Sequence, residues 1–109
     1  MITDEVFNQL KAIHKNLTEN EFAKSYLCTS RSYLCNRRNK NKDVSNDVAL
    51  NLYCALIKKA NQWKVSASRE PVIQYRLRWD QLSDHYLSIA GDVVEIILKR
   101  AEHNYLLAD

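Results

Sequence analysis

Apolar residues near the start of the chain recur every three or four positions, which is the spacing of one face of an α-helix. Thr3 and two acidic residues stand at the beginning of this series, which consists of Val6, Leu10, Ile13 and Leu17. A threonine cap followed by acids is typical of a helix N-terminus, where the macrodipole is positive. The pattern predicts a first helix from about Thr3 to near Asn16.

The next two helices are predicted from their caps. Residues 18–21 read Thr-Glu-Asn-Glu, which is the form of a capping box, and Leu17 and Phe22 stand where a hydrophobic staple would close across it. The second helix should therefore begin at Glu19, and the residues it can bury are Phe22, Ala23, Tyr26 and Leu27. Residues 28–30 interrupt it, and either Thr29 or Ser30 caps a third helix over residues 31–39.

A long apolar stripe predicts the fourth helix, with Ser45 as its cap. The stripe consists of Ala49, Leu52, Tyr53, Leu56, Ile57, Ala60 and Trp63. Residues 64–70 then read as a linker, and Pro71 suits the first turn of a fifth helix, where its missing N–H group costs nothing.

Apolar residues in the last third alternate steps of three and four, which is the heptad pattern of a helix-packing seam. The seam consists of Val72, Tyr75, Trp79, Leu82, Tyr86, Ile89, Val93 and Ile96. Two alternatives stay open here. Gly91 and Asp92 could break the segment into a helical hairpin, or one long helix could run through them. The seam could join two copies of the chain, or it could pack on the fourth helix of its own chain. A second stripe of Leu87, Ala90, Val94, Ile97 and Ala101 makes the segment apolar on two sides, which favours a partner, most simply a second copy.

Composition agrees with an all-α protein of five or six helices. Glycine and proline occur once each in 109 residues, and 46% of the residues are apolar. A chain of this length forms about one domain. We expect a head over residues 1–65 and a C-terminal dimerisation segment over residues 70–107, in one compact unit. With no membrane-span-length apolar run and no signal peptide, a cytoplasmic protein is expected.

Positive charge is concentrated in one fifth of the sequence. Residues 22–42 contain six lysines or arginines and no acid, whereas the rest has ten basic and thirteen acidic residues, a net charge of −3. A local basic cluster of this kind is the electrostatic footprint expected for a polyanion. The alternative is a solvated basic surface with no nucleic-acid role.

Residues 17–60 resemble the helix-turn-helix of phage repressors and Cro proteins. Phe22 and Ala23 match the apolar-alanine pair of the first helix of that motif, and Thr29 and Ser30 match the cap of the second. The resemblance implies that the helix at 31–39 lies in the DNA major groove. It also implies base-facing positions at Arg31, Ser32, Cys35 and Asn36, and phosphate contacts at Arg37, Arg38, Lys40 and Lys42.

The sequence departs from that family at the turn. The usual turn glycine is replaced by Leu27 or Cys28, depending on the register. Counted from Ala23, the buried residue of the second helix falls one place before Leu34. Either Tyr33 takes that role, or the turn is one residue longer than usual.

Other chemistries have little support. Cys28, Cys35 and Cys54 have no metal-ligand spacing, and a site made by Cys28, Cys35 and His14 is far less expected than buried thiols. Asp80, Asp84 and His85 lie close together without a nucleophile, so no enzyme, cofactor or metal is expected. The sequence thus predicts a small dimeric regulator of repressor type that binds double-stranded DNA. The alternative is a helical module of phage or mobile-element type that binds a protein partner through its C-terminal helices.

Overall fold

The computed structural model describes residues 2–108, and for residues 105–108 only the backbone. This part of the chain contains five α-helices and one π-helical turn and no strand, which confirms the predicted all-α fold. The elements are α1 (Ile2–Ile13), α2 (Glu19–Phe22), the π-helical turn η1 (Ala23–Leu27), α3 (Arg31–Asn39), α4 (Asn46–Arg69) and α5 (Ile73–Ala108). Met1 and the side chains of 105–107, which belong to the predicted segments, lie outside the described residues.

The helix α1 begins and ends earlier than the sequence predicts. It starts at Ile2, so Thr3 is a buried residue of the first turn rather than a cap. It ends at Ile13, after which the Leu17 amide donates to the His14 carbonyl in a turn. The predicted start of α2 at Glu19 is confirmed, because the Glu21 amide donates to the Thr18 hydroxyl.

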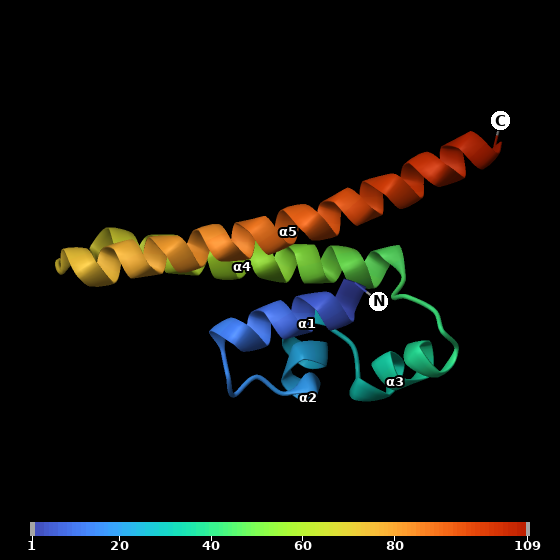
Figure 1. Ribbon diagram of the computed structural model, residues 1–109, viewed down its shortest axis with the longest axis horizontal. Helices are drawn as coiled ribbons and strands as arrows, with labels where there is room; N and C mark the ends of the chain where they lie inside the picture. The colour runs from blue at the N-terminus through green and yellow to red at the C-terminus, as the bar shows by residue number, and fades with distance from the viewer. Residues whose placement is uncertain (1, 109) are drawn as a thin grey trace.

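The long helices α4 and α5 form an antiparallel hairpin that runs the length of the molecule (Figure 1). The predicted linker at 64–70 is wrong, because α4 continues to Arg69. Ala67 is buried there, and the Ser68 hydroxyl donates to the Val65 carbonyl at 2.7 Å. The turn lies at residues 70–72, and Pro71 belongs to this turn and not to the first turn of α5.

The helix α5 is continuous over 36 residues, so the alternative of a helical hairpin broken at Gly91 is wrong. Gly91 has ordinary helical backbone geometry, so Asp92 caps nothing. Small residues bring α4 and α5 close together: Ala60 and Ser83 are both buried, and the Ser83 hydroxyl donates to the Ala60 carbonyl at 2.8 Å.

One hydrophobic core joins the predicted head and the predicted C-terminal segment. It includes Val6 and Leu10 of α1, all four residues predicted to be buried in the second helix, and the middle of the α4–α5 hairpin. On one side of the hairpin lie α1 and η1, which packs directly on α4, with α2 and α3 farther from the hairpin (Figure 1). None of the described helices is both long and apolar enough to cross a membrane.

The heptad seam packs mainly inside the chain. Tyr86, Ile89 and Val93 are at most 3% exposed, so in this fold they cannot contact a second copy as predicted. Trp79, Leu82 and Ile96 are half-buried, and only Val72 and Tyr75 among the seam residues are exposed. In its middle part, the seam packs on helices of its own chain, as in the second alternative. Heptad spacing predicts which face of a helix is apolar but not which helix that face contacts.

Candidate nucleic-acid interface

The segment from Thr18 to Asn39 forms two short helical stretches joined by a tight turn. Thr18 caps the first stretch, and the Tyr33 amide donates to the Ser30 hydroxyl at the start of α3. Between them, Cys28 adopts a left-handed conformation with φ 55° and ψ 39°. Cys28 therefore occupies the turn position that glycine usually takes, and Leu27 is a buried core residue.

The π-helical turn η1 accounts for the one-residue offset in the sequence. A π-helix places one extra residue in a helical turn, as an inserted residue would. The Cys28 and Thr29 amides both donate to the carbonyl of Ala23. Leu34 is 1% exposed and Tyr33 is half-buried, so Leu34 is the core residue of α3. The alternative with one extra residue is correct, and the extra residue lies in the helix that precedes the turn.

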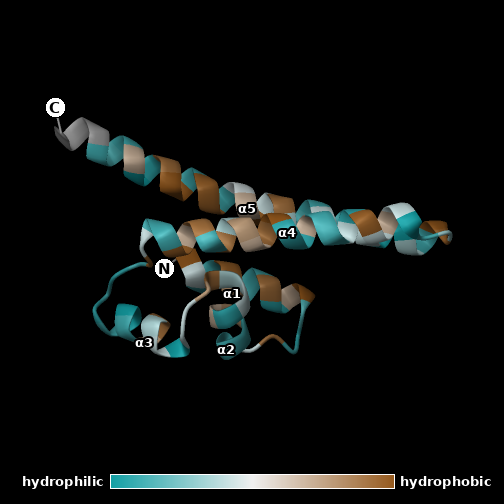
Figure 2. Ribbon diagram, turned by 180° about the vertical axis from the view of Figure 1, so that it is seen from behind, coloured by the Kyte–Doolittle hydropathy of each residue, from teal (hydrophilic) through white to brown (hydrophobic). Residues whose placement is uncertain are grey.

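The side of α3 opposite Leu34 is exposed and polar. It carries three of the predicted base-facing residues: Ser32, Cys35 and Asn36. Arg31 is also exposed, but it lies one helical turn before Leu34 on the same side of α3 and lines a pocket with Phe7 and Lys11 of α1. Lys40 and Lys42 are exposed on the following loop, and Lys24 is exposed on η1. Within the described part of the chain, no carboxylate forms an ion pair with Arg31 or with these three lysines. Figure 2 shows that hydrophilic residues dominate α3 and the loop after it.

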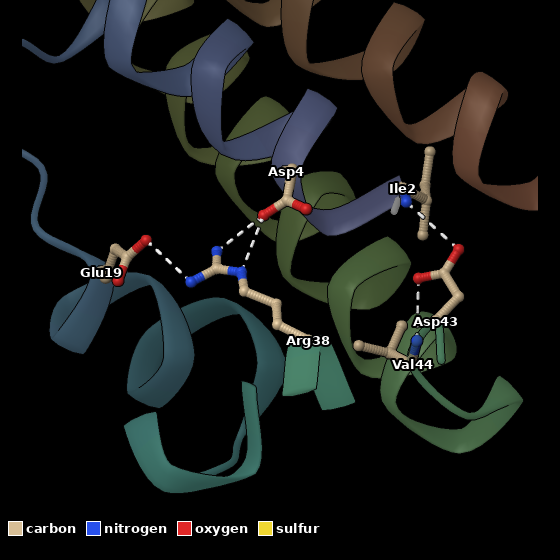
Figure 3. Close-up of polar contacts among 6 residues, drawn as sticks. All are labelled: Ile2, Asp4, Glu19, Arg38, Asp43 and Val44. Atoms are coloured by element: carbon tan, nitrogen blue, oxygen red, sulfur yellow. Dashed lines mark hydrogen bonds and ion pairs between the residues drawn. The ribbon is translucent and has the colours of Figure 1, made fainter. Parts of the chain in front are cut away.

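Arg38 was predicted to contact phosphate, but it binds inside the protein. Its Nη2 atom lies 2.6 Å from a carboxylate oxygen of Asp4, and its Nη1 atom lies 3.1 Å from one of Glu19 (Figure 3). The hydrogen bonds that Arg38 donates to Asp4, and the nearby charges of both acids, raise the pKa of Arg38, and burial opposes them. Arg38 therefore links α3 to α1 and α2 with its charge already paired to two carboxylates, so its predicted phosphate contact stays a prediction that competes with these ion pairs. The sequence could not reveal this link, because Asp4 lies 34 positions away.

Arg37 is less free to bind a phosphate than the exposed lysines, but it is not held by ion pairs as Arg38 is. Its guanidinium lies over the ring of Tyr33, 5.6 Å from the centroid, and its Nε atom is buried without a hydrogen-bond partner among the described residues. The Tyr33 hydroxyl accepts from the Ser45 amide at 3.1 Å. Arg37 thus stacks against the side chain that joins α3 to the start of α4, which leaves it less free than the loop lysines.

The loop that carries Lys40 and Lys42 is fixed at Asp43. The Asp43 carboxylate accepts from the amides of Ile2 and Val44, at 3.2 and 2.8 Å (Figure 3). It also lies 3.1 Å from Nη2 of Arg100 on α5, whose other terminal nitrogen donates to the Val44 carbonyl at 2.9 Å. Both ends of the chain therefore hold this loop. Sequence reasoning missed Asp43 and Arg100, since only the fold brings them together.

A partly buried polar cluster beside the end of α1, between α4 and α5, was also missed. The imidazole Nε2 of His14 is hydrogen-bonded to the hydroxyl of Tyr86. Burial and the charge of Lys59 lower the pKa of His14, whereas burial raises the pKa of Tyr86. The cavity beside this pair has a volume of about 250 Å³ and is lined by Lys59, Gln62, Trp63 and Ser66 as well.

The residues considered for other chemistry are dispersed. All three cysteines have free thiols and are exposed, contrary to the expectation of buried thiols. Asp80 forms an ion pair with Lys64 at 3.3 Å, while Asp84 and His85 are exposed. Among the described residues, no group of three or more histidines, cysteines or acids is placed to hold a metal ion.

Comparison with known proteins gives one match. A protein family described as a family of unknown function (DUF6626) matches residues 3–97, which include the head, the α4–α5 hairpin and most of α5. No curated protein and no solved structure matches the chain.

Proposed function

The chain belongs to DUF6626, a family of unknown function, and we propose that it binds double-stranded DNA through the exposed side of α3. The observation that carries the proposal is the placement of Ser32, Cys35 and Asn36 on that side, opposite the buried Leu34, with Arg31 exposed at the first turn of α3. A short capped helix held by its apolar side, with its polar side outward, has the layout of a recognition helix. The protein would act as a dimeric transcriptional regulator of repressor type.

The chemistry of the exposed residues suits this role. Arginine can donate two hydrogen bonds to the guanine edge, and asparagine can pair with the adenine edge. Arg31 and Asn36 would therefore read bases. Lysines on a loop act as point charges toward phosphates, which suits Lys24, Lys40 and Lys42.

The strength of the salt dependence follows from the unpaired lysines. If each of two heads neutralises phosphates with these three side chains, about six counterions are released, and log K falls against log salt with a slope of about −5. Affinity would drop about a thousandfold between about 50 and 200 mM salt.

The test is fluorescence-anisotropy binding to random duplex DNA across a range of salt concentrations. We expect Lys40→Glu combined with Lys42→Glu to weaken binding by more than tenfold and to flatten the salt dependence. The control Lys58→Glu combined with Arg69→Glu makes the same charge change at exposed positions of α4, and should have a much smaller effect. A folded wild-type protein that does not bind duplex DNA even at low salt would refute the proposal.

Asn36→Ala separates base reading from phosphate binding. Truncation should cost about 1–3 kcal/mol on a selected preferred site, and it should leave binding to random DNA nearly unchanged. Equal losses on both DNAs would show that Asn36 does not read bases.

A second candidate function is a helical module that binds a protein partner. It is favoured by the tip of the α4–α5 hairpin. Among the side chains that the structure describes, the tip holds five of the eight large hydrophobic residues that are exposed: Val65, Val72, Ile73, Tyr75 and Leu77. Under this alternative, Ile73→Asp with Leu77→Asp would abolish activity and the loop-lysine variant would not. The DNA proposal predicts the reverse.

A further inference from the structure

One side of the C-terminal half of α5 is apolar but has no partner in the chain. Five residues on it alternate steps of four and three, which keeps them on one face of the helix. We call them the outer stripe: Leu87, Gly91, Val94, Leu98 and Ala101. Leu87 is 43% and Leu98 is 63% exposed, whereas Val93 on the core side is fully buried. The outer stripe is therefore distinct from the seam that packs against the core.

Gly91 lies in the middle of this stripe, and nothing within the chain requires glycine there. A Cβ atom at Gly91 would meet no atom within 4 Å, and its backbone is not left-handed. Glycine inside a helix costs about 1 kcal/mol relative to alanine. Close approach of a backbone or side chain from another molecule would explain why glycine stands at this position.

The helix α5 also extends beyond the rest of the fold. Arg100 donates to Asn46, the first residue of α4, and to Val44 just before it. The residues of α5 after Arg100 therefore have no α4 residue beside them. The remaining residues to Ala108 project past the hairpin (Figure 1). A contiguous exposed apolar face of this kind commonly marks an interaction site.

We propose that the outer stripe binds the outer stripe of a second copy, with the two α5 helices antiparallel and crossing near Val94. In a two-fold contact, residue i of one copy meets residue j of the other and the reverse. Leu87 and Ala101 lie seven residues before and after Val94, and Gly91 and Leu98 lie at nearly equal distances from it. Each leucine therefore faces a small residue: Leu87 lies opposite Ala101, and Leu98 enters the space above Gly91. The two Val94 side chains meet at the crossing.

Charge does not oppose this contact. Glu95 borders the stripe, and its carboxylate is paired with Lys99 at 3.2 Å. An apolar contact is weakened little by salt, whereas phosphate binding is weakened strongly. This contact deepens the proposed function, because a dimer brings together the two DNA-binding heads that the function requires. Association is measured on the free protein, so it is tested independently of DNA binding.

The test is sedimentation equilibrium of the full chain in the absence of DNA. The wild type should approach twice 12.7 kDa with rising concentration, at low and at high salt. Gly91→Leu should weaken association by more than tenfold, while the monomer stays folded, because the new side chain meets nothing inside its own chain. The control Gln81→Leu adds the same side chain at an exposed position of α5 away from the stripe, and should associate like the wild type.

A second pair of variants covers the ends of the stripe. Leu98→Lys should produce a monomer, while Val65→Lys, at an apolar residue of α4 with 49% exposure, should not. A wild type that is monomeric at every concentration overturns the inference, as does a Gly91→Leu protein that dimerises like the wild type. A dimer that ignores DNA would refute only the proposed function, and a monomer that binds DNA would refute only the dimer contact.

Discussion

Cys28 is exposed and adopts a left-handed backbone conformation, with φ 55°, between η1 and α3. This conformation brings the Cβ atom close to the following carbonyl oxygen and costs a residue other than glycine about 1–2 kcal/mol. Cys28→Gly removes that strain. No burial is lost with the thiol, because the side chain faces solvent.

The expected gain in the free energy of unfolding is smaller than the strain energy that the substitution removes. Glycine also increases the conformational freedom of the unfolded chain, which offsets about 0.5–1 kcal/mol. The free energy of unfolding should therefore rise by about 0.5–1 kcal/mol, which corresponds to a midpoint about 2–6 °C higher for a domain of this size. Cys28→Val should lower stability, since a β-branched side chain tolerates positive φ poorly.

Chemical denaturation under reducing conditions measures these changes. Cys54→Gly is the matched control, because it makes the same chemical change at an exposed residue inside α4. There the change should lower the free energy of unfolding by about 0.5–1 kcal/mol. The two variants should thus shift stability in opposite directions, and a loss of stability in both would refute the assignment of strain to Cys28.

Three further predictions concern the contacts that hold the helices together. Arg38→Gln should lower the free energy of unfolding by about 1 kcal/mol at low salt and by less at high salt, measured by denaturant titration, because its ion pairs are partly exposed. Ser83→Ala should cost at most about 1 kcal/mol for the lost hydrogen bond, whereas Ser83→Leu should cost about 1–3 kcal/mol by overpacking the contact with α4. The lowered pKa of His14 means that the unfolded state binds its proton first, so stability is full above about pH 6.5 and falls as the pH drops below it. In thermal unfolding, His14→Gln should reduce this pH dependence.

The starts of α2, α3 and α4 were predicted well, because each depends on side chains next to it in the sequence, whereas the starts of α1 and α5 were not. Thr18, Ser30 and Ser45 each accept a hydrogen bond from the amide three residues later, and α2, α3 and α4 begin directly after them. Features without such a local signal were mispredicted. The residues at 64–70 resemble a linker in composition, yet packing of Ala67 in the hairpin keeps them helical.

At the candidate site, too, features with a local sequence signal were predicted and features that depend on tertiary contacts were not. The resemblance placed Arg31, Ser32, Cys35 and Asn36 at base-facing positions, and all four are exposed. Once Leu34 is known to be the core residue, helical spacing explains the exposure of Ser32, Cys35 and Asn36. The internal role of Arg38 depends on Asp4 and Glu19, which only tertiary structure brings within 3.1 Å. The π-helical turn also has no sequence signature here, and only the one-residue offset between Ala23 and Leu34 pointed to it.

The helix α3 has one fully buried side chain, Leu34, so polar links contribute much of what fixes its position. Arg38 ties it to α1 and α2, and Asp43 ties the following loop to Ile2 and to Arg100 of α5. Side chains held in this way lose little further freedom on binding, which favours affinity. Arg100 lies only two residues beyond Leu98 in the outer stripe. If two copies pair through that stripe, the same turns of α5 both set the separation of the two heads and anchor the loop that carries Lys40 and Lys42.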